Sequence, residues 1–354
     1  MIAVALGAGS LSCAFTLLLV PLVIRLCHRW RLLDQPGPLK IHARPVPRLG
    51  GVALVLATTV SVFLAEPRAA IHHWPFFVVL SLIWIAGTID DVRSLSIVFR
   101  LAAQITAGVL LWRGGSQVPT AGSSVVSVVA TCIFVISLVN CFNFLDGSDG
   151  VAAGVAGIIS AAYAVISASR ADAFNAALAC ATAGACLGFL AHNRAPAKIF
   201  LGDSGSTALG LIIAFLSLNF WGFGAPGLPR TMFPILVAIL PLLDGILAII
   251  RRLLRGDSPL FGDRSHIYDG MLARGWTPRR VALVCYAITA AFVAIAFGGL
   301  RSESPQFWLA AALGVVLLFA LATKLGSLPL WKDTRRQHMK SKTGEMRDDV
   351  AGAR

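Results

Sequence analysis

The feature that most constrains this chain is a succession of apolar segments, many of them long enough to cross a lipid bilayer. Only 13% of the 354 residues are charged and 57% are hydrophobic, whereas a soluble globular domain carries about 25% charged residues. A bilayer requires the backbone polar groups of a spanning segment to be satisfied internally, which helices of roughly 20 residues achieve. The sequence therefore predicts an all-α polytopic membrane protein.

Eleven apolar segments are candidate transmembrane helices. They cover residues 2–26, 50–65, 74–89, 99–112, 124–139, 151–168, 174–191, 205–221, 232–250, 281–298 and 306–323. Several are shorter than the roughly 20 residues of an upright span. If either 50–65 or 99–112 does not cross the bilayer, the count is ten helices. The first segment lacks the basic start and small-residue cleavage site of a signal peptide, and we interpret it as a retained span.

The basic residues are distributed unevenly between the two sides of the predicted bundle. With the N-terminus outside, 25 of the 30 Lys and Arg residues fall in inner connections and five in outer ones. This positive-inside bias explains the net charge of +13 without a nucleic-acid partner. It predicts that the polar loops and the C-terminus are cytoplasmic, with residues 1–323 as one transmembrane catalytic domain. Residues 324–354 are a basic tail that we expect to be disordered along the anionic leaflet.

The inner connections carry nearly all of the chemically suggestive residues, and all of their polar motifs fall on the same predicted side. Because one side of a membrane bundle is one surface, the motifs form a single candidate site. They are Asp90-Asp91, residues 140–150 (NCFNFLDGSDG), residues 198–206 (KIFLGDSGS), Asp244 and residues 262–270 (GDRSHIYDG).

Each motif also has a plainer interpretation. The Asp90-Asp91 pair could be a solvated helix end, with Asp91 or Ser94 capping the next helix. Residues 140–150 place two amides and two acids at intervals of three, where helical neighbours share a face, but the run could be a simple turn. Its members are Asn140, Asn143, Asp146 and Asp149.

Two further acids and a histidine complete the set. Asp203 follows Gly202 in a GDSG string, which also occurs in chymotrypsin-like proteases, but the His and Asp context of those enzymes is missing. Asp244 lies inside an apolar segment, where an ionised carboxylate costs about 2.5 to 3.5 kcal/mol, so a functional or paired role is favoured. The arginine-rich stretch after it suits diphosphate or phospholipid headgroups. His266 within it is either structural or catalytic.

Carboxylate and amide oxygens dominate the inner loops, without a His or Cys cluster. The seven cysteines form no CxxC pair and resemble small buried hydrophobes. Hard oxygen ligands select Mg²⁺, with Mn²⁺ as the alternative, and Mg²⁺ is usually completed by water and substrate phosphates. The sequence predicts a magnesium-dependent phosphoryl reaction at a membrane face.

The ordered motifs resemble those of the polyprenyl-phosphate N-acetylhexosamine-1-phosphate transferases, glycosyltransferase family 4, which include the phospho-N-acetylmuramoyl-pentapeptide transferases. The matched strings are RPVPRLGG, GTIDD, NCFNFLDGSDG, KIFLGDSGS and the PLLD to DRSH stretch, over residues 44–276. The resemblance implies transfer of a sugar 1-phosphate from a UDP-sugar to polyprenyl phosphate, such as undecaprenyl phosphate, with release of UMP. It further implies a multi-pass protein of the bacterial inner membrane that initiates envelope polysaccharide synthesis.

The resemblance also assigns roles to individual residues. Asp203 and Asn143 would bind Mg²⁺, and Asp90 with Asp91 would face the lipid phosphate. Asp146 and Asp149 would bind the uridine nucleotide or order the site. His266 and Arg264 would hold the sugar diphosphate, and Arg44 and Asn140 would also bind substrate.

Departures from the family pattern bear on the sugar. The pentapeptide branch carries three adjacent histidines in the last inner loop, whereas this chain has SHIYDG, with Tyr268 in place of a second histidine. The chain therefore resembles the undecaprenyl-phosphate N-acetylglucosaminyl-1-phosphate branch more closely, with pentapeptide transfer as the alternative. A transporter with intramembrane carboxylates is the rival class, but it predicts mid-bilayer acids and repeat symmetry. A homodimer is left open.

Overall fold

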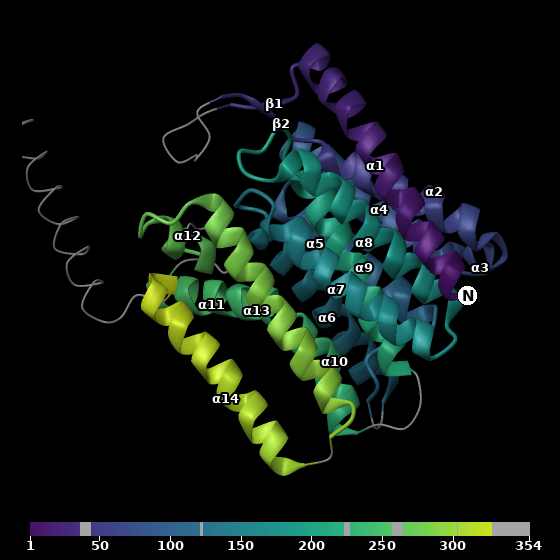
Figure 1. Ribbon diagram of the computed structural model, residues 1–354, viewed down its shortest axis with the longest axis vertical. Helices are drawn as coiled ribbons and strands as arrows, with labels where there is room; N and C mark the ends of the chain where they lie inside the picture. Colours follow the sequence, from purple (N-terminus) through teal and green to yellow (C-terminus); the bar gives the residue numbers. More distant parts are fainter. Residues whose placement is uncertain (36–43, 121–122, 223–226, 257–264, 303, 328–354) are drawn as a thin grey trace, which may run out of the picture.

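The structure, a computed structural model, describes the chain except for residues 36–43, 121–122, 223–226, 257–264, 303 and 328–354. Within those limits the chain is helical apart from one short hairpin (Figure 1). The helices are α1 (Ile2–Trp30), α2 (Gly50–Ala65), α3 (Pro67–His72), α4 (Trp74–Val92), α5 (Ile97–Arg113), α6 (Ser124–Leu145), α7 (Val151–Ser169), α8 (Ala173–Asn193), α9 (Gly202–Gly222), α10 (Leu228–Val237), α11 (Ile239–Arg255), α12 (Ile267–Leu272), α13 (Pro278–Gly299) and α14 (Pro305–Ala322), followed by the π-helical turn η1 (Thr323–Ser327).

Each of the eleven predicted segments is helical, which confirms an all-α polytopic membrane protein. Among the described residues, eight helices are long and apolar enough to cross a bilayer, or nine if α10 and α11 are taken as one bent span. The two remaining predicted spans are α2, with 16 residues, and α5, with 17. The count of eleven and the orientation of the termini stay predictions.

Helix α9 occupies the centre of the bundle and is buried along most of its length (Figure 1). It packs against α2, α4, α6 and α7. Glycines permit this close approach, because a Cβ built on Gly51 would lie 2.1 Å from the backbone nitrogen of Gly205, and one on Gly87 2.6 Å from the carbonyl oxygen of Asp203. Small residues at crossings are the usual means of close helix packing in membranes. The N-terminus of α9 is thereby held tightly between α2 and α4.

The segment predicted as a single span at 232–250 is broken instead. Helices α10 and α11 meet at a bend of 74° at Ala238. The sequence placed Asp244 inside this apolar segment but did not predict the bend. Asp244 lies in the second turn of α11, beyond the bend, and is buried.

A two-stranded antiparallel hairpin connects α1 to α2. Strands β1 (Leu33–Asp34) and β2 (Val46–Pro47) pair Leu33 with Pro47. The chain after β2 then bonds to the segment that precedes α9: Gly50 and Gly51 donate to the carbonyl oxygens of Phe200 and Leu201, at 3.0 and 2.8 Å. The two segments meet at the same end of the bundle as the start of α9.

We expect Gly51→Ala to destabilise the protein, because the added methyl group would collide with the backbone of α9 rather than with a flexible side chain. Overpacking of this kind costs about 1 to 3 kcal/mol. Thermal unfolding of the detergent-purified protein would measure the loss. The matched control is Gly7→Ala, where nothing lies within 4 Å of the new methyl group and stability should hold or rise. Equal unfolding temperatures for the two variants would contradict the packing argument.

Candidate active site

One cavity of about 1780 Å³ opens at the end of the bundle where the predicted inner loops meet. Its wall is built from α5, α6, the loop after α6, the loop before α9, the first turn of α9, and α11 to α13. Eight of the ten predicted site residues line it: Arg44, Asp91, Asn140, Asn143, Asp146, Asp149, Asp203 and His266. Of the other two, Asp90 is not among the residues that line the cavity, and Arg264 is outside the described residues.

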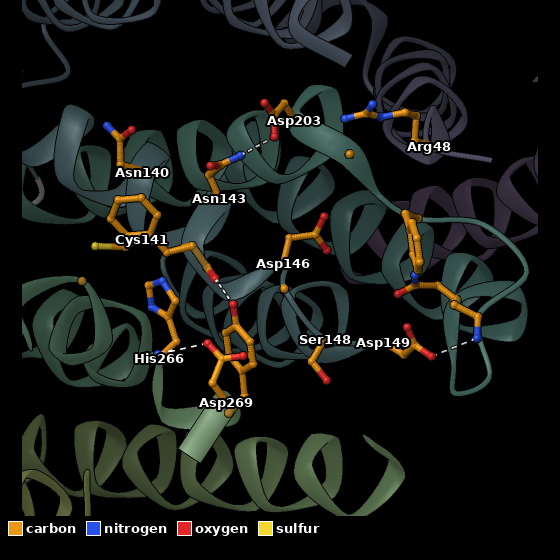
Figure 2. Close-up of a pocket in the computed structure, with 18 of the residues that line it drawn as sticks. Arg48, Asn140, Cys141, Asn143, Asp146, Ser148, Asp149, Asp203, His266 and Asp269 are labelled. Carbon is orange, nitrogen blue, oxygen red and sulfur yellow. Dashed lines mark hydrogen bonds between the residues drawn. The ribbon is translucent and has the colours of Figure 1, made fainter. Parts of the chain in front are cut away.

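Asn143 and Asp203, the two predicted metal ligands, are in direct contact (Figure 2). Nδ2 of Asn143 donates to Oδ1 of Asp203 at 2.7 Å and to Oγ of Ser206 at 3.1 Å. The pair joins the last turn of α6 to the first turn of α9. The side chains are 60 residues apart in the sequence, and the packing of α6 on α9 brings them together.

Asp91 caps α9. Its two carboxylate oxygens accept hydrogen bonds from the backbone N–H groups of Asp203 and Ser204, at 2.9 and 3.0 Å. Gly202 precedes them with φ of +74°, and a Cβ there would lie 2.6 Å from the Asp91 carboxylate. An anion at a helix N-terminus satisfies free donors and interacts favourably with the helix dipole.

The geometry alters two expectations for this motif. Asp91 does cap a helix, but the helix is α9 and not the next one, since Ser96 caps α5 through the Phe99 N–H. Both oxygens of Asp91 are already engaged by backbone, so a direct contact with a lipid phosphate would compete with the cap.

Asp90 faces the start of α5. Its carboxylate accepts from the Leu95 N–H at 2.5 Å and pairs with Nη1 of Arg100 at 3.2 Å. Arg100 lines the cavity and Asp90 does not. Asp90 thus holds a cavity arginine in place. Sequence reasoning missed Arg100, although a cation near the start of an apolar helix was a signal that could have revealed it.

Asp146 projects into the space between the Asn143–Asp203 pair and the Ser148–Asp149 turn (Figure 2). Removal from bulk water raises its pKa well above the ordinary value, and the carboxylates of Asp203 and Asp91 raise it further. The centre of the cavity is therefore crowded with acidic groups.

Asp149 orders the loop before α9. Its Oδ2 accepts a hydrogen bond from the Ala197 N–H at 3.0 Å (Figure 2). Asn193, which sequence reasoning missed, acts alongside: its side chain accepts from the Gly150 N–H at 3.0 Å and donates to the Ile199 carbonyl at 2.8 Å. Asp149 therefore holds this loop, and its two predicted roles, nucleotide binding or ordering of the site, stay predictions.

Asp244 is paired with His266. Its Oδ2 lies 2.7 Å from Nδ1 of His266, and its Oδ1 accepts from the Ile267 N–H at 2.8 Å. The ring of His266 is stacked on that of Tyr268 with centroids 5.5 Å apart. The Tyr268 hydroxyl in turn donates to the Phe144 carbonyl at 3.0 Å. The expectation that Asp244 has a partner is thus met by a residue 22 positions away.

Asn140 turns its amide toward α5. Its Nδ2 donates to Oε1 of Gln104 at 2.7 Å, and both residues line the cavity. Gln104 is another cavity residue that the sequence did not single out.

Basic side chains surround the acidic centre. The cavity is lined by Arg44, Arg48, Arg100, Lys198, Arg252 and Arg279. Guanidinium groups bind carboxylate and phosphate oxygens through paired hydrogen bonds. A cavity with an acidic centre and a basic rim suits a polyanion that arrives with a divalent cation.

The described residues contain no group of three or more His, Cys, Asp or Glu side chains arranged as a metal centre. The cysteines, all within the described part of the chain, are free thiols. The donor set that remains, Asp203 with Asn143, supplies carboxylate and amide oxygens. Such a set fits a hard cation that keeps water and phosphate ligands.

The fold and cavity thus define a polytopic membrane protein with a cavity of acidic and basic side chains at one end of its helices. The family described as glycosyl transferase family 4 matches residues 73–220. The decaprenyl-phosphate N-acetylglucosaminephosphotransferase of Mycobacterium tuberculosis is 32% identical, over 84% of this chain and 83% of the relative. This chain belongs to glycosyl transferase family 4, and it is an enzyme of that family.

Other relatives bear on the branch. A probable undecaprenyl-phosphate N-acetylglucosaminyl 1-phosphate transferase of Bacillus subtilis is 28% identical, over 85% of this chain and 86% of the relative. A phospho-N-acetylmuramoyl-pentapeptide-transferase of Moorella thermoacetica is 31% identical over 78% of this chain and 93% of the relative. The resemblance to the N-acetylglucosaminyl branch is confirmed.

We expect Asp91→Ala to lower the unfolding temperature, because it removes the cap of the central helix. Loss of such a cap costs about 0.5 to 2 kcal/mol. The contrasting variant is Asp203→Asn, which removes a charge from the crowded acidic centre and should unfold at or above the wild-type temperature. Both are measured by thermal unfolding in detergent. A wild-type unfolding temperature for Asp91→Ala would show that the cap contributes nothing to stability.

Proposed function

We propose that this protein transfers an N-acetylhexosamine 1-phosphate, foremost N-acetylglucosamine 1-phosphate, from a UDP-sugar to a polyprenyl phosphate. An oxygen of the lipid phosphate attacks the β-phosphorus of the UDP-sugar, the bond to the UMP oxygen breaks, and polyprenyl-diphosphate-sugar and UMP are the products. The reaction takes place at the cytoplasmic face of the bacterial inner membrane and starts an envelope polysaccharide. The observation that carries the proposal is the Asn143–Asp203 pair within a cavity that has a basic rim and an apolar wall.

The apolar wall supports a lipid acceptor. Leu242, Ile246 and Ile249 of α11 line the cavity, as do Ile97 and Leu101 of α5. The side of α11 that carries Ile246 and Ile249 is also exposed, at 52% and 43%. An exposed apolar surface that continues into a polar cavity suits a substrate with a hydrocarbon chain and a phosphate head. The names of the relatives include decaprenyl and undecaprenyl phosphate.

The basic rim supports a diphosphate donor. Arg100 is oriented by Asp90, and Nε of Arg279 donates to the Ala195 carbonyl at 2.7 Å, so both guanidinium groups approach the cavity from fixed positions. Preorganised cations of this kind stabilise charge that moves during phosphoryl transfer.

The crowded carboxylates support a divalent cation. Asp203 and Asn143 would hold Mg²⁺, or Mn²⁺ in its place, and the bound ion would neutralise charge on the diphosphate. Burial raises the pKa of Asp146 most, and the same ion would offset the further rise that the neighbouring carboxylates cause. Asp203 and Asn143 themselves fix where the diphosphate is presented, because they join two packed helices.

The acceptor needs no general base. A phosphate monoester has a second pKa of about 6, so it is mostly dianionic at neutral pH. The carboxylate of Asp90 is already engaged by the Leu95 N–H and by Arg100. We therefore assign Asp90 to the positioning of Arg100 and of the acceptor, and not to proton removal.

The direct test is release of UMP by the detergent-purified protein, given undecaprenyl phosphate, Mg²⁺ and a panel of UDP-N-acetylhexosamines that includes the muramoyl-pentapeptide. We expect release with UDP-N-acetylglucosamine that depends on both lipid and metal. If UMP is released only with the muramoyl-pentapeptide donor, the protein is a pentapeptide transferase and the proposed sugar is wrong. Nucleotide binding without lipid-dependent release, or no binding at all, would favour the transporter class and overturn the proposal.

We expect Asp203→Asn to reduce turnover by at least about 100-fold, because a metal ion contributes several kcal/mol to the transition state. Nucleotide-dependent binding of Mn²⁺, followed by its paramagnetic signal, should be lost as well. The matched control is Asp172→Asn, which removes a carboxylate that caps α8 at the opposite end of that helix from the cavity. Retention of both turnover and Mn²⁺ binding in Asp203→Asn would exclude it from the metal site.

A further inference from the structure

The contacts of Asp244 separate it from the residues that meet the substrate. Its side chain is 1% exposed, and it is absent from the cavity wall, although its neighbours Leu242 and Gly245 belong to that wall. His266 does line the cavity. Asp244 can therefore influence a bound substrate only through the groups that it holds.

The two oxygens of Asp244 have different partners. Oδ1 accepts the Ile267 N–H and thereby fixes the start of α12, while Oδ2 meets Nδ1 of His266. An ionised carboxylate only accepts hydrogen bonds, so this pairing requires the tautomer with the proton on Nδ1, in which Nε2 is the ring nitrogen on the far side of the ring from Asp244. A carboxylate that served only to hold α12 would need the contact with the Ile267 N–H and not the second contact with His266.

A closed ring of contacts fixes the histidine relative to the acidic centre. Helix α11 packs so closely on α6 that a Cβ on Gly245 would lie 2.3 Å from Sγ of Cys141. Asp244, next to Gly245, holds His266, and Tyr268 returns to α6 through the Phe144 carbonyl. The His266 ring also lies 5.5 Å from the Phe144 ring. Its position is thereby tied to the same turn of α6 that carries Asn143.

From this geometry we infer that Asp244 is a positioning residue, which sets the tautomer and orientation of His266 so that Nε2 meets the sugar diphosphate in the cavity. The inference rests on the proposed function for the identity of that ligand. The pairing itself rests only on the contacts of Asp244, His266 and Ile267.

The decisive variant is Asp244→Asn. Its amide oxygen can still accept the Ile267 N–H and keep α12 in place, but its NH₂ group cannot accept from Nδ1–H, so the opposite tautomer is favoured. We expect kcat to fall by about 10- to 100-fold, as for other partners that orient a functional histidine. We expect KM for the UDP-sugar to change less than about threefold, since the other contacts of the substrate remain.

A double-mutant cycle tests whether Asp244 acts through the ring. If it does, Asp244→Asn causes no further loss of activity when His266 is already replaced in His266→Gln. An equal loss in both backgrounds would show that Asp244 acts independently of His266 and would overturn the inference. Unfolding temperatures of all variants confirm that the comparison is between folded proteins.

Nitrogen-15 NMR of the histidine-labelled protein gives a readout that does not depend on activity. The ring signals that vanish in His266→Gln belong to His266, and we expect Asp244→Asn to move them from the Nδ1-protonated pattern to the Nε2-protonated one. Unmoved signals would refute the pairing whatever the enzyme does. Moved signals in a protein without transferase activity would leave the pairing standing and remove the proposed function instead.

Discussion

The arrangement of the cavity depends on the way the N-terminus of α9 is held. Asp91 from α4 accepts two backbone N–H groups there, and Gly51 and Gly87 allow α2 and α4 to approach within contact of the same turn. The free donors of a buried helix end require partners, and the carboxylate supplies them across a helix interface. Because Asp203 is the second residue of that helix, its position follows from the cap, and the contact with Asn143 follows from both.

The charges of the cavity are ordered from this point outward. Acidic groups meet at the centre, where burial, and then the charges of Asp203 and Asp91, raise the pKa of Asp146. Arginines held by Asp90 and by the Ala195 carbonyl line the same cavity. Neither the acidic groups nor the arginines are stable away from water unless charges of opposite sign pair with them. A substrate that brings phosphates to the rim and a cation to the centre would satisfy both at once. Binding of the sugar nucleotide and of the metal are accordingly expected to reinforce one another.

The sequence predicted the membrane class and all eleven helical segments, and eight of its ten site residues line the cavity, because hydrophobic length and motif clustering are local signals. It did not predict which groups each motif contacts. Asp91 bonds to residues 112 and 113 positions away, and nothing local distinguishes a cap of α9 from a cap of α5. The sequence did not single out Asn193 and Gln104, because both are uncharged and both lie outside the polar motifs. The bend at Ala238 had a weak local signal in Pro234 and Pro241, since proline disrupts a helix interior.

That bend unites two properties of the site that seem unrelated in the sequence. Had 232–250 formed one straight span, Asp244 would lie inside the apolar bundle, where its charge is costly. The 74° turn instead carries the start of α11 against Cys141 of α6, so that Asp244 meets His266 and the Ile267 N–H. The same turn leaves Ile246 and Ile249 both exposed and in the cavity wall. One helix therefore presents the apolar surface that we propose for the lipid chain and, on adjacent residues, fixes the histidine that we propose meets the sugar diphosphate. A change that straightened the bend would disturb both functions together, whereas Asp244→Asn separates them.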